Sequence, residues 1–261
     1  MTAAHRDPGH AVRDTRPQQR VARAQGMRSA RTRALRLTRA ATLALACALA
    51  ACAGGPPAPD WAVNAHGALM RFEAAWLRGD TRIADAEFVR ARAELARTGR
   101  FDQVAHAELV RCALRVASLE PDDCPGFVAL APDVPPALNA YAAYLTGRWA
   151  SVDGALLPPQ HRAILAGTRT VASLEDPVSR LVAAGALLRA GRIDPPAIAE
   201  AVETASAHGW RRPLLAWLSL QAQRARAAGD TAAADTLQRR IDLVGGGAAP
   251  AAPAPPEPAP R

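Results

Sequence analysis

The stretch that decides the fold runs from residue 65 to residue 97 and reads AHGALMRFEAAWLRGDTRIADAEFVRARAELAR. In its first half, apolar residues follow one another at steps of four, three and four, at Ala65, Leu69, Phe72 and Trp76. The second half repeats these steps at Ala84, Phe88, Ala91 and Leu95. Such spacing gathers side chains on one face of an α-helix. Because Arg78-Gly79-Asp80 interrupts the pattern, the stretch predicts two amphipathic helices in an antiparallel hairpin.

The charged residues of this hairpin support the same interpretation. On the second helix, the face opposite the apolar stripe carries charges spaced for ion pairs along a solvated surface, at Glu87, Arg90, Glu94 and Arg97. A third stripe follows, at Phe101, Ala105, Leu109, Cys112 and Val116, with Glu108, Arg111 and Arg115 opposed to it. This stripe predicts a third helix and places Cys112 on its buried face.

Helical signals continue to the end of the domain. Two apolar stripes lie near the C-terminus, one at Leu215, Leu218, Ala222 and Ala225 and the other at Ala234, Leu237, Ile241 and Val244. Asp176-Pro177 and Asp194-Pro195 have the form of an N-cap followed by proline in the first helical turn. Further glycine-containing breaks fall at Thr98-Gly99, Thr146-Gly147, Ala190-Gly191 and Ala228-Gly229-Asp230. No period-two alternation indicates a strand, so we predict an all-α fold.

The segment from Pro121 to Pro159 differs from the rest of the domain. It contains seven prolines, and proline inside a helix removes a hydrogen bond and clashes with the preceding turn. Its helices are therefore expected to be short or irregular.

Charge is distributed unevenly along the 261 residues. The chain has 32 basic and 24 acidic side chains, for a net charge of +8. Residues 1–51 contain ten arginines and two aspartates, which leaves 22 arginines and 22 acids in residues 52–261. The basic excess belongs to the N-terminal segment, and a neutral remainder gives no support to nucleic-acid binding.

That N-terminal segment has the pattern of an export signal. Arginines between Met27 and Arg39 precede twelve uncharged residues, Ala40 to Ala51, which are mostly Ala and Leu. Twelve helical residues rise about 18 Å, too short for a membrane core of about 30 Å. Asp7, Asp14 and the uniform apolar run argue against a mitochondrial presequence. The length of the segment before Met27 predicts that translation starts at Met27.

The apolar run ends in Leu49-Ala50-Ala51-Cys52, which resembles the lipobox of bacterial lipoproteins. The resemblance implies that residues 1–51 are a cleaved signal peptide and that Cys52 becomes an acylated N-terminus. Ala53 stands where these lipoproteins carry Asp for retention in the inner membrane. The resemblance therefore implies lipid anchoring to the outer membrane of a Gram-negative bacterium, facing the periplasm. The alternative is an ordinary signal peptide cut near an Ala-x-Ala site, with Cys52 incidental.

Processing at Cys52 also defines the remaining organisation. Residues 52–59 have the composition of a flexible tether, residues 60–244 form the helical domain, and residues 245–261 are a Gly/Ala/Pro-rich tail that we expect to be disordered. Cys47 leaves with the signal peptide, so Cys112 and Cys124 stay as a pair in an oxidising compartment. We expect a disulfide between them, the alternative being two buried thiols.

Two hairpins share a loose motif. Residues 79–85 and 229–235 both read G-D-T-x-x-A-D, and each joins an aromatic-containing helix to a second helix. Such hairpins resemble tetratricopeptide units, although the W-x2-L-G-x2-Y signature is absent. The resemblance implies antiparallel hairpins stacked as a tetratricopeptide-like array.

No sequence motif identifies a reaction. The chain has no nucleophile elbow, P-loop, dinucleotide fingerprint, HExxH, CxxC or four-ligand zinc pattern, and we expect no cofactor and no metal. Four histidines outside the signal peptide are scattered at positions 66, 106, 161 and 208, and a structural role is the simplest interpretation of each. His161 stands out because it follows the rigid pair Pro158-Pro159.

One aromatic group, Tyr141, Tyr144 and Trp149, rises above the background. The two tyrosines share a helix face, and Trp149 opens the next segment. Core packing between helices is one interpretation; the other is a binding patch on a concave face. The second interpretation predicts an interhelical pocket where these residues meet His161 and acids such as Asp153.

These observations lead to two hypotheses for function. Outer-membrane lipoproteins with helical-repeat domains are commonly scaffolds or adaptors, so the resemblance implies a non-enzymatic partner of other envelope proteins. A purely structural role between membrane and cell wall is compatible with the same pattern. The alternative is a small-ligand binder or enzyme with a pocket around Tyr141, Tyr144, Trp149 and His161.

Overall fold

The computed structural model describes residues 58–120 and 122–246. These residues form no strand, which confirms the all-α fold class. The α-helices are α2 (Asp60–Arg78), α3 (Thr81–Ala96), α4 (Phe101–Ala117), α5 (Pro125–Val128), α6 (Pro136–Leu145), α7 (Pro159–Leu165), α8 (Pro177–Arg189), α9 (Pro195–Ala207), α10 (Arg211–Ala227) and α11 (Thr231–Gly245). Short 3-10 helices are η1 (Ala131–Asp133), η2 (Trp149–Ser151), η3 (Gly154–Leu156) and η4 (Val171–Ser173). Within these ranges, no helix has the length and apolar character needed to traverse a bilayer.

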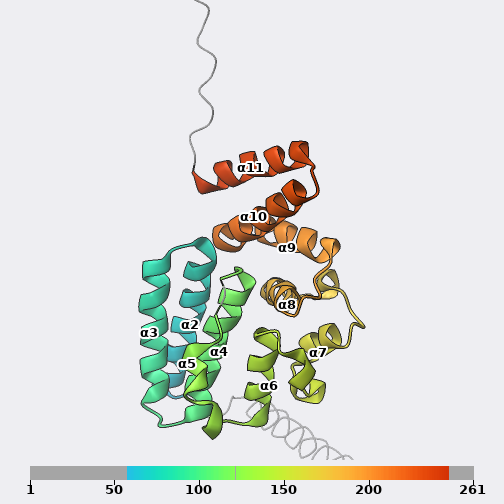
Figure 1. Cartoon of the computed structure of the whole chain (residues 1–261). Coiled ribbons are helices and arrows are strands. Elements are labelled where there is room, and N and C mark those ends of the chain that lie inside the picture. Colours follow the sequence, from blue (N-terminus) through green and yellow to red (C-terminus); the bar gives the residue numbers. More distant parts are fainter. Residues whose placement is uncertain (1–57, 121, 247–261) are drawn as a thin grey trace, which may run out of the picture. The chain divides into compact units, whose positions relative to one another are not determined.

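The predicted hairpins are present at both ends of the domain. Helices α2 and α3 pack along each other, and α10 and α11 form a second hairpin (Figure 1). Each hairpin turns at a glycine in the left-handed region, Gly79 with φ 94° and Gly229 with φ 76°. A side chain at such φ values is strained, so glycine suits these breaks. Helices α2, α3 and α4 lie side by side, α10 lies at one end of this layer next to α2, and α11 lies beyond α10 while α9 packs on α8 (Figure 1).

Side-chain caps start several helices at the predicted residues. Asp176 accepts a hydrogen bond from the Ser179 N–H at 2.7 Å, and Asp194 accepts one from the Ala197 N–H at 2.9 Å. Pro177 and Pro195 follow as the first helical residues. Proline costs nothing there because the first N–H groups of a helix have no intrahelical acceptor. The predicted starts of α8 and α9 are therefore confirmed.

Helix α4 lies between two groups of core residues. Val104, Ala107 and Leu114 pack into a core with α2 and α3, whereas Leu109 and Val116 belong to a larger core shared with α6 to α10. Both faces of α4 are consequently covered. A helix in this position needs apolar residues on more than one face.

Two expectations for α4 are wrong. Phe101, placed on the apolar stripe, is 52% exposed because it opens the helix, while Glu108, placed on the opposed charged face, is only 4% exposed. Two arginines pair with the buried carboxylate, Arg92 from α3 at 2.8 Å and Arg111 at 2.8 Å. The covering of α4 on both sides puts its predicted polar face inside the protein, and the paired charges make the burial tolerable.

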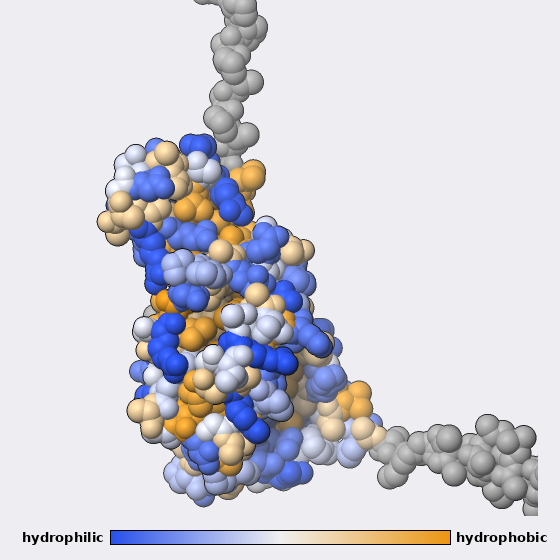
Figure 2. All heavy atoms as spheres, turned by 90° about the vertical axis from the view of Figure 1, so that its right-hand side faces the viewer, coloured by the Kyte–Doolittle hydropathy of each residue, from blue (hydrophilic) through white to orange (hydrophobic). Residues whose placement is uncertain are grey.

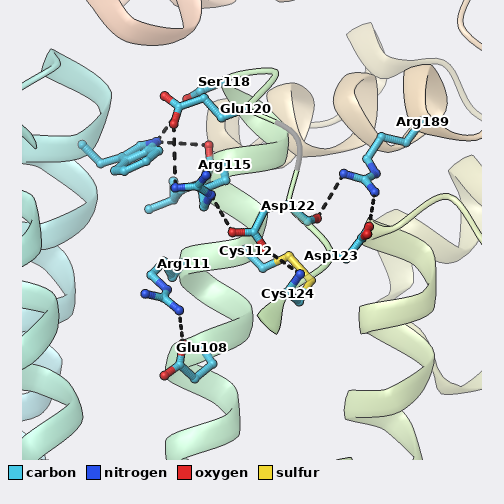
Figure 3. Close-up of polar contacts among 12 residues, drawn as sticks. Glu108, Arg111, Cys112, Arg115, Ser118, Glu120, Asp122, Asp123, Cys124 and Arg189 are labelled. Atoms are coloured by element: carbon cyan, nitrogen blue, oxygen red, sulfur yellow. Dashed lines mark hydrogen bonds and ion pairs between the residues drawn. A yellow bond between two sulfur atoms is a disulfide. The ribbon is translucent and has the colours of Figure 1, made fainter. Parts of the chain in front are cut away.

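The predicted disulfide is present between Cys112 in α4 and Cys124 just before α5. Asp122 forms an ion pair with Arg115 at 2.7 Å and accepts a hydrogen bond from the Cys124 N–H (Figure 3). From α8, Arg189 donates to the Asp122 carbonyl at 3.0 Å and to the Asp123 carboxylate at 2.6 Å. The segment around the disulfide therefore links α4 to α8.

A single arginine links the C-terminal helices to the first hairpin. Arg212 in α10 donates to the Trp76 carbonyl at 2.9 Å and pairs with Glu120 at 2.6 Å. Its guanidinium also lies 4.0 Å from the centre of the Trp76 ring. Arginine suits this position because its planar group can stack on an aromatic ring while it donates several hydrogen bonds.

Several predicted segments fall outside the described residues. These are the signal peptide over 1–51 with its start at Met27, the lipidated Cys52, the tether up to residue 57, and the tail from residue 247 onward. Helix α11 ends at Gly245, one residue beyond the predicted end of the domain. The central segment from 122 to 159 contains only short helices, as its prolines predict.

Candidate ligand-binding site

Two helices around the candidate site, α6 and α7, have proline as their first residue. Helix α6 begins at Pro136 after Pro135, and α7 begins at Pro159 after Pro158. Proline fixes φ near the helical value and disfavours helix for the residue before it. Each proline pair therefore sets a helix start, and the site residues Tyr141 and His161 follow within the next two turns.

The predicted aromatic residues meet in one stack. The Tyr144 ring lies 5.2 Å from the Trp149 ring with an interplanar angle of 10°, and 6.2 Å from the Tyr141 ring at 13°. The His161 ring lies 5.0 Å from Tyr144 and 5.5 Å from Tyr141. Trp149 also donates from Nε1 to the Tyr144 carbonyl at 2.9 Å. The structure thus brings all four predicted residues together.

Members of this stack differ in their surroundings. Tyr144 is fully buried and Trp149 is 9% exposed, so both belong to the core between helices. Tyr141 and His161 instead line a cavity of about 550 Å³. Core packing explains Tyr144 and Trp149, whereas Tyr141 and His161 are the two residues of the set that reach a pocket.

The cavity lies among α2, α4, α6, α7 and α8. Most of its wall is apolar, at Leu109, Val110, Ala113, Leu114, Ala137, Leu138, Leu156, Leu157, Pro158, Val178 and Val182. Its polar residues are Glu73, His106, Tyr141, Gln160, His161 and Ser179. Concave, largely apolar sites with a few polar groups, and volumes of roughly 300–1,000 Å³, are typical of small-molecule binding.

His161 has an unusual environment within this wall. The side chain is 3% exposed, and its Nδ1 atom has no hydrogen-bond partner among the described residues. Burial lowers the pKa of the imidazole to about 4, although the Asp176 carboxylate acts in the opposite direction. Near neutral pH the ring is therefore uncharged and one of its nitrogens can accept a hydrogen bond.

The two tyrosines are also affected by burial. Burial raises the pKa of both phenols above the ordinary value. The Tyr144 hydroxyl is buried in the core and has no hydrogen-bond partner among the described residues. Both phenols therefore stay protonated at neutral pH.

Sequence reasoning missed the acid of this site. Glu73 in α2 is half-buried in the cavity wall, and burial raises the pKa of its carboxyl above the ordinary value, with Asp176 adding to the effect. The one available signal was its place beside Phe72 in the apolar stripe. His106 of α4 also lines the cavity, and its side chain is exposed.

Asp153, the acid expected here, lies elsewhere. Its carboxylate accepts a hydrogen bond from the Ala155 N–H at 2.9 Å and caps η3, and it is not part of the cavity wall. The other histidines play no part in the pocket: His66 is exposed, and His208 stacks on Trp210 at 4.6 Å. Asp153 instead accepts a hydrogen bond from a backbone N–H two residues along the chain, as aspartate commonly does in turns.

One further group has the composition of a metal site. Atoms of Cys112, Asp122 and Cys124 lie within 4.8 Å of one another. A metal would need the cysteines as thiolates, and here the two sulfurs are bonded to each other. The group is therefore a structural disulfide with a neighbouring carboxylate.

No family model, no curated protein and no solved structure matches this chain.

Proposed function

We propose that the helical domain binds a small, largely apolar ligand in the cavity between α2, α4, α6, α7 and α8. The observation that supports this proposal is a cavity of about 550 Å³ with His161 buried in its wall, where no described residue is a hydrogen-bond partner for Nδ1. A buried polar atom without a partner costs about 1–3 kcal/mol. A hydrogen bond from a bound ligand would offset that cost.

The apolar wall determines which ligands suit the cavity. Leu109, Leu138 and Val182 come from three different helices and present apolar surface. An apolar ligand that covers this surface stabilises the complex by about 25 cal/mol for each Å² removed from water. Its few polar groups include Glu73, Tyr141 and His161, and the Asp176 carboxylate acts on all three. Such a wall favours a molecule with an apolar body and one polar end.

The ligand-binding proposal is tested with the uncharged fluorescent probe N-phenyl-1-naphthylamine. Binding in the cavity should raise its fluorescence saturably, and Ala137→Trp, which fills the cavity from α6, should weaken binding at least about tenfold. The matched control is Ala86→Trp, on the exposed face of α3. Equal binding by both variants, with both folded by circular dichroism, would contradict the proposal.

We also propose that the protein is anchored through Cys52 to the outer membrane and faces the periplasm. Two observations support this: the lipobox-like residues 49–52 and the Cys112–Cys124 disulfide, which suits an oxidising compartment. Expressed in a Gram-negative host, the chain should partition with outer membranes, and Cys52→Ser should release it. Mass spectrometry of the N-terminal peptide should find acyl groups on Cys52. An unmodified peptide would contradict the proposal.

The scaffold or adaptor role stays a prediction, supported by the resemblance to helical-repeat lipoproteins. On the face shown in Figure 2, apolar surface occurs in several patches separated by polar residues. Crosslinking in intact cells followed by mass spectrometry tests the role. Reproducible recovery of an envelope protein would support it, and recovery of none would count against it.

A further inference from the structure

The charge pattern of the described residues singles out Glu73. Eight acidic side chains in these ranges are buried or half-buried, and seven of them form an ion pair with an arginine. The seven are Glu87, Glu94, Asp102, Glu108, Glu120, Asp122 and Glu200. Glu73 is the exception, and it lines the cavity. A partly buried carboxylate is costly without a countercharge.

Nearby arginines are bound elsewhere. Arg71, two residues before Glu73 in α2, pairs with Glu87 at 3.0 Å, and Arg180 in α8 pairs with Glu200 at 3.3 Å. The wall of the cavity contains no arginine among the described residues. Among residues 58–120 and 122–246, Glu73 therefore faces the cavity without an arginine partner.

The groups around Glu73 favour a positive charge in the cavity. From the start of α8, the Asp176 carboxylate acts on Glu73, Tyr141 and His161 alike. Gln160 of α7, which also lines the cavity, carries no formal charge. Because the described residues of the cavity wall include Glu73 and no arginine, and Asp176 adds a second negative charge nearby, an anionic ligand would be repelled.

The hydrogen-bonding groups of the cavity also favour a cationic ligand. His161 is only 3% exposed and is neutral near pH 7, and its Nδ1 has no partner in the described part of the chain, so this nitrogen can accept a hydrogen bond. Glu73 offers carboxylate oxygens, and the ring of Tyr141 is aromatic surface that attracts cations. An ammonium group only donates hydrogen bonds, and it therefore complements this set of acceptors.

We propose that the cavity selects a monocationic amphiphile, a molecule with an apolar body and one ammonium group, and that the ammonium pairs with Glu73. This inference rests on the proposed ligand-binding function and names its ligand class. The apolar body lies against the aliphatic wall, where Leu109, Leu138 and Val182 cover it.

The test compares three competitors that share an eight-carbon hydrocarbon tail and differ in their head group: octylammonium, 1-octanol and octanoate. Each competes with N-phenyl-1-naphthylamine for the full chain carrying Cys52→Ser, which avoids detergent that would itself fill the cavity. Near pH 7, octylammonium should compete at a concentration at least about tenfold lower than 1-octanol, because hydrogen bonds to charged groups are worth about that factor. Octanoate should be the weakest of the three.

The decisive variant is Glu73→Gln, which keeps the shape of the side chain and removes its charge. It should abolish the advantage of octylammonium over 1-octanol. Glu203→Gln is the matched control, since it removes one exposed charge of α9. If Glu73→Gln does not fold, the order of the three probes on the unsubstituted chain decides alone.

The possible outcomes separate the two proposals. If 1-octanol or octanoate competes as well as octylammonium, or if Glu73→Gln keeps the advantage of octylammonium, the cation inference is overturned and ligand binding stands. If the fluorescent probe itself does not bind, ligand binding is overturned too. A cation preference lost only in Glu73→Gln supports both.

Discussion

At the scale of single residues, the same residue type takes different roles according to what surrounds it. Tyr144 and Tyr141 lie one helical turn apart in α6, yet Tyr144 is fully buried in the core and Tyr141 lines the cavity. Likewise Asp153 caps a short helix, whereas Glu73, a less conspicuous acid in the sequence, reaches the pocket. Neither difference can be read from spacing along the chain, because each depends on which other helix lies opposite.

His161 should make the stability of the protein depend on pH. An unfolded imidazole titrates near 6.5, and the folded pKa is about 4. Between these values the unfolded chain binds a proton that the folded chain does not, so acid favours unfolding. The contribution is complete above pH 6.5, and about 2 kcal/mol of it should be lost at pH 5.

Urea unfolding of the full chain and of His161→Gln, at pH 7 and at pH 5, measures this effect. The unsubstituted chain should lose about 2 kcal/mol more free energy of unfolding than the variant between the two pH values. An equal loss in both proteins would show that His161 stays solvated and titrates normally.

At the scale of elements, close approach between helices depends on small residues. Gly185 of α8 lies against the backbone of α4, and a Cβ added there would come within 2.3 Å of the Val116 carbonyl oxygen. Gly67 of α2 differs, since an added Cβ would meet only the end of the flexible Arg71 side chain at 3.2 Å. Both glycines are inside helices, so helix propensity alone would favour alanine at each.

We therefore expect opposite effects from two identical substitutions. Gly67→Ala should raise the free energy of unfolding by about 0.5–1 kcal/mol, because alanine stabilises a helix interior. Gly185→Ala should lower it by about 1–3 kcal/mol, because the methyl group forces α8 away from α4. Thermal and urea unfolding measure both. A stabilised Gly185→Ala would mean that α4 and α8 do not approach as closely as described.

At the scale of the whole molecule, covalent and ionic links join parts of the chain that are distant in sequence. The Cys112–Cys124 disulfide closes a segment whose residues Asp122 and Asp123 bind Arg189 in α8 (Figure 3). Arg212 extends this network from α10 to Glu120 and α2. Arginine contributes to most of these links, which agrees with a chain whose basic residues are all arginine.

Removal of the disulfide should therefore lower the stability of the domain as a unit. A closed loop of about a dozen residues contributes roughly 3 kcal/mol by constraining the unfolded chain. Urea unfolding of the full chain carrying Cys52→Ser, with and without reductant, should differ by about this amount. The same chain with Cys112→Ala and Cys124→Ala added should not respond to reductant. An unchanged midpoint for the cysteine-containing chain would refute the prediction.

What the sequence by itself determined is local: helical periodicity, the caps at Asp176 and Asp194, the glycine turns, and the pairing of Cys112 with Cys124. These follow from interactions between residues near one another in the chain, and so spacing is enough to predict them. The tertiary structure alone decided that Glu108 is buried, that Asp153 is not at the site, and that Glu73 faces the cavity. The physical reason is that burial and charge pairing depend on the helix packed opposite, and that partner is set by the assembly of the whole fold.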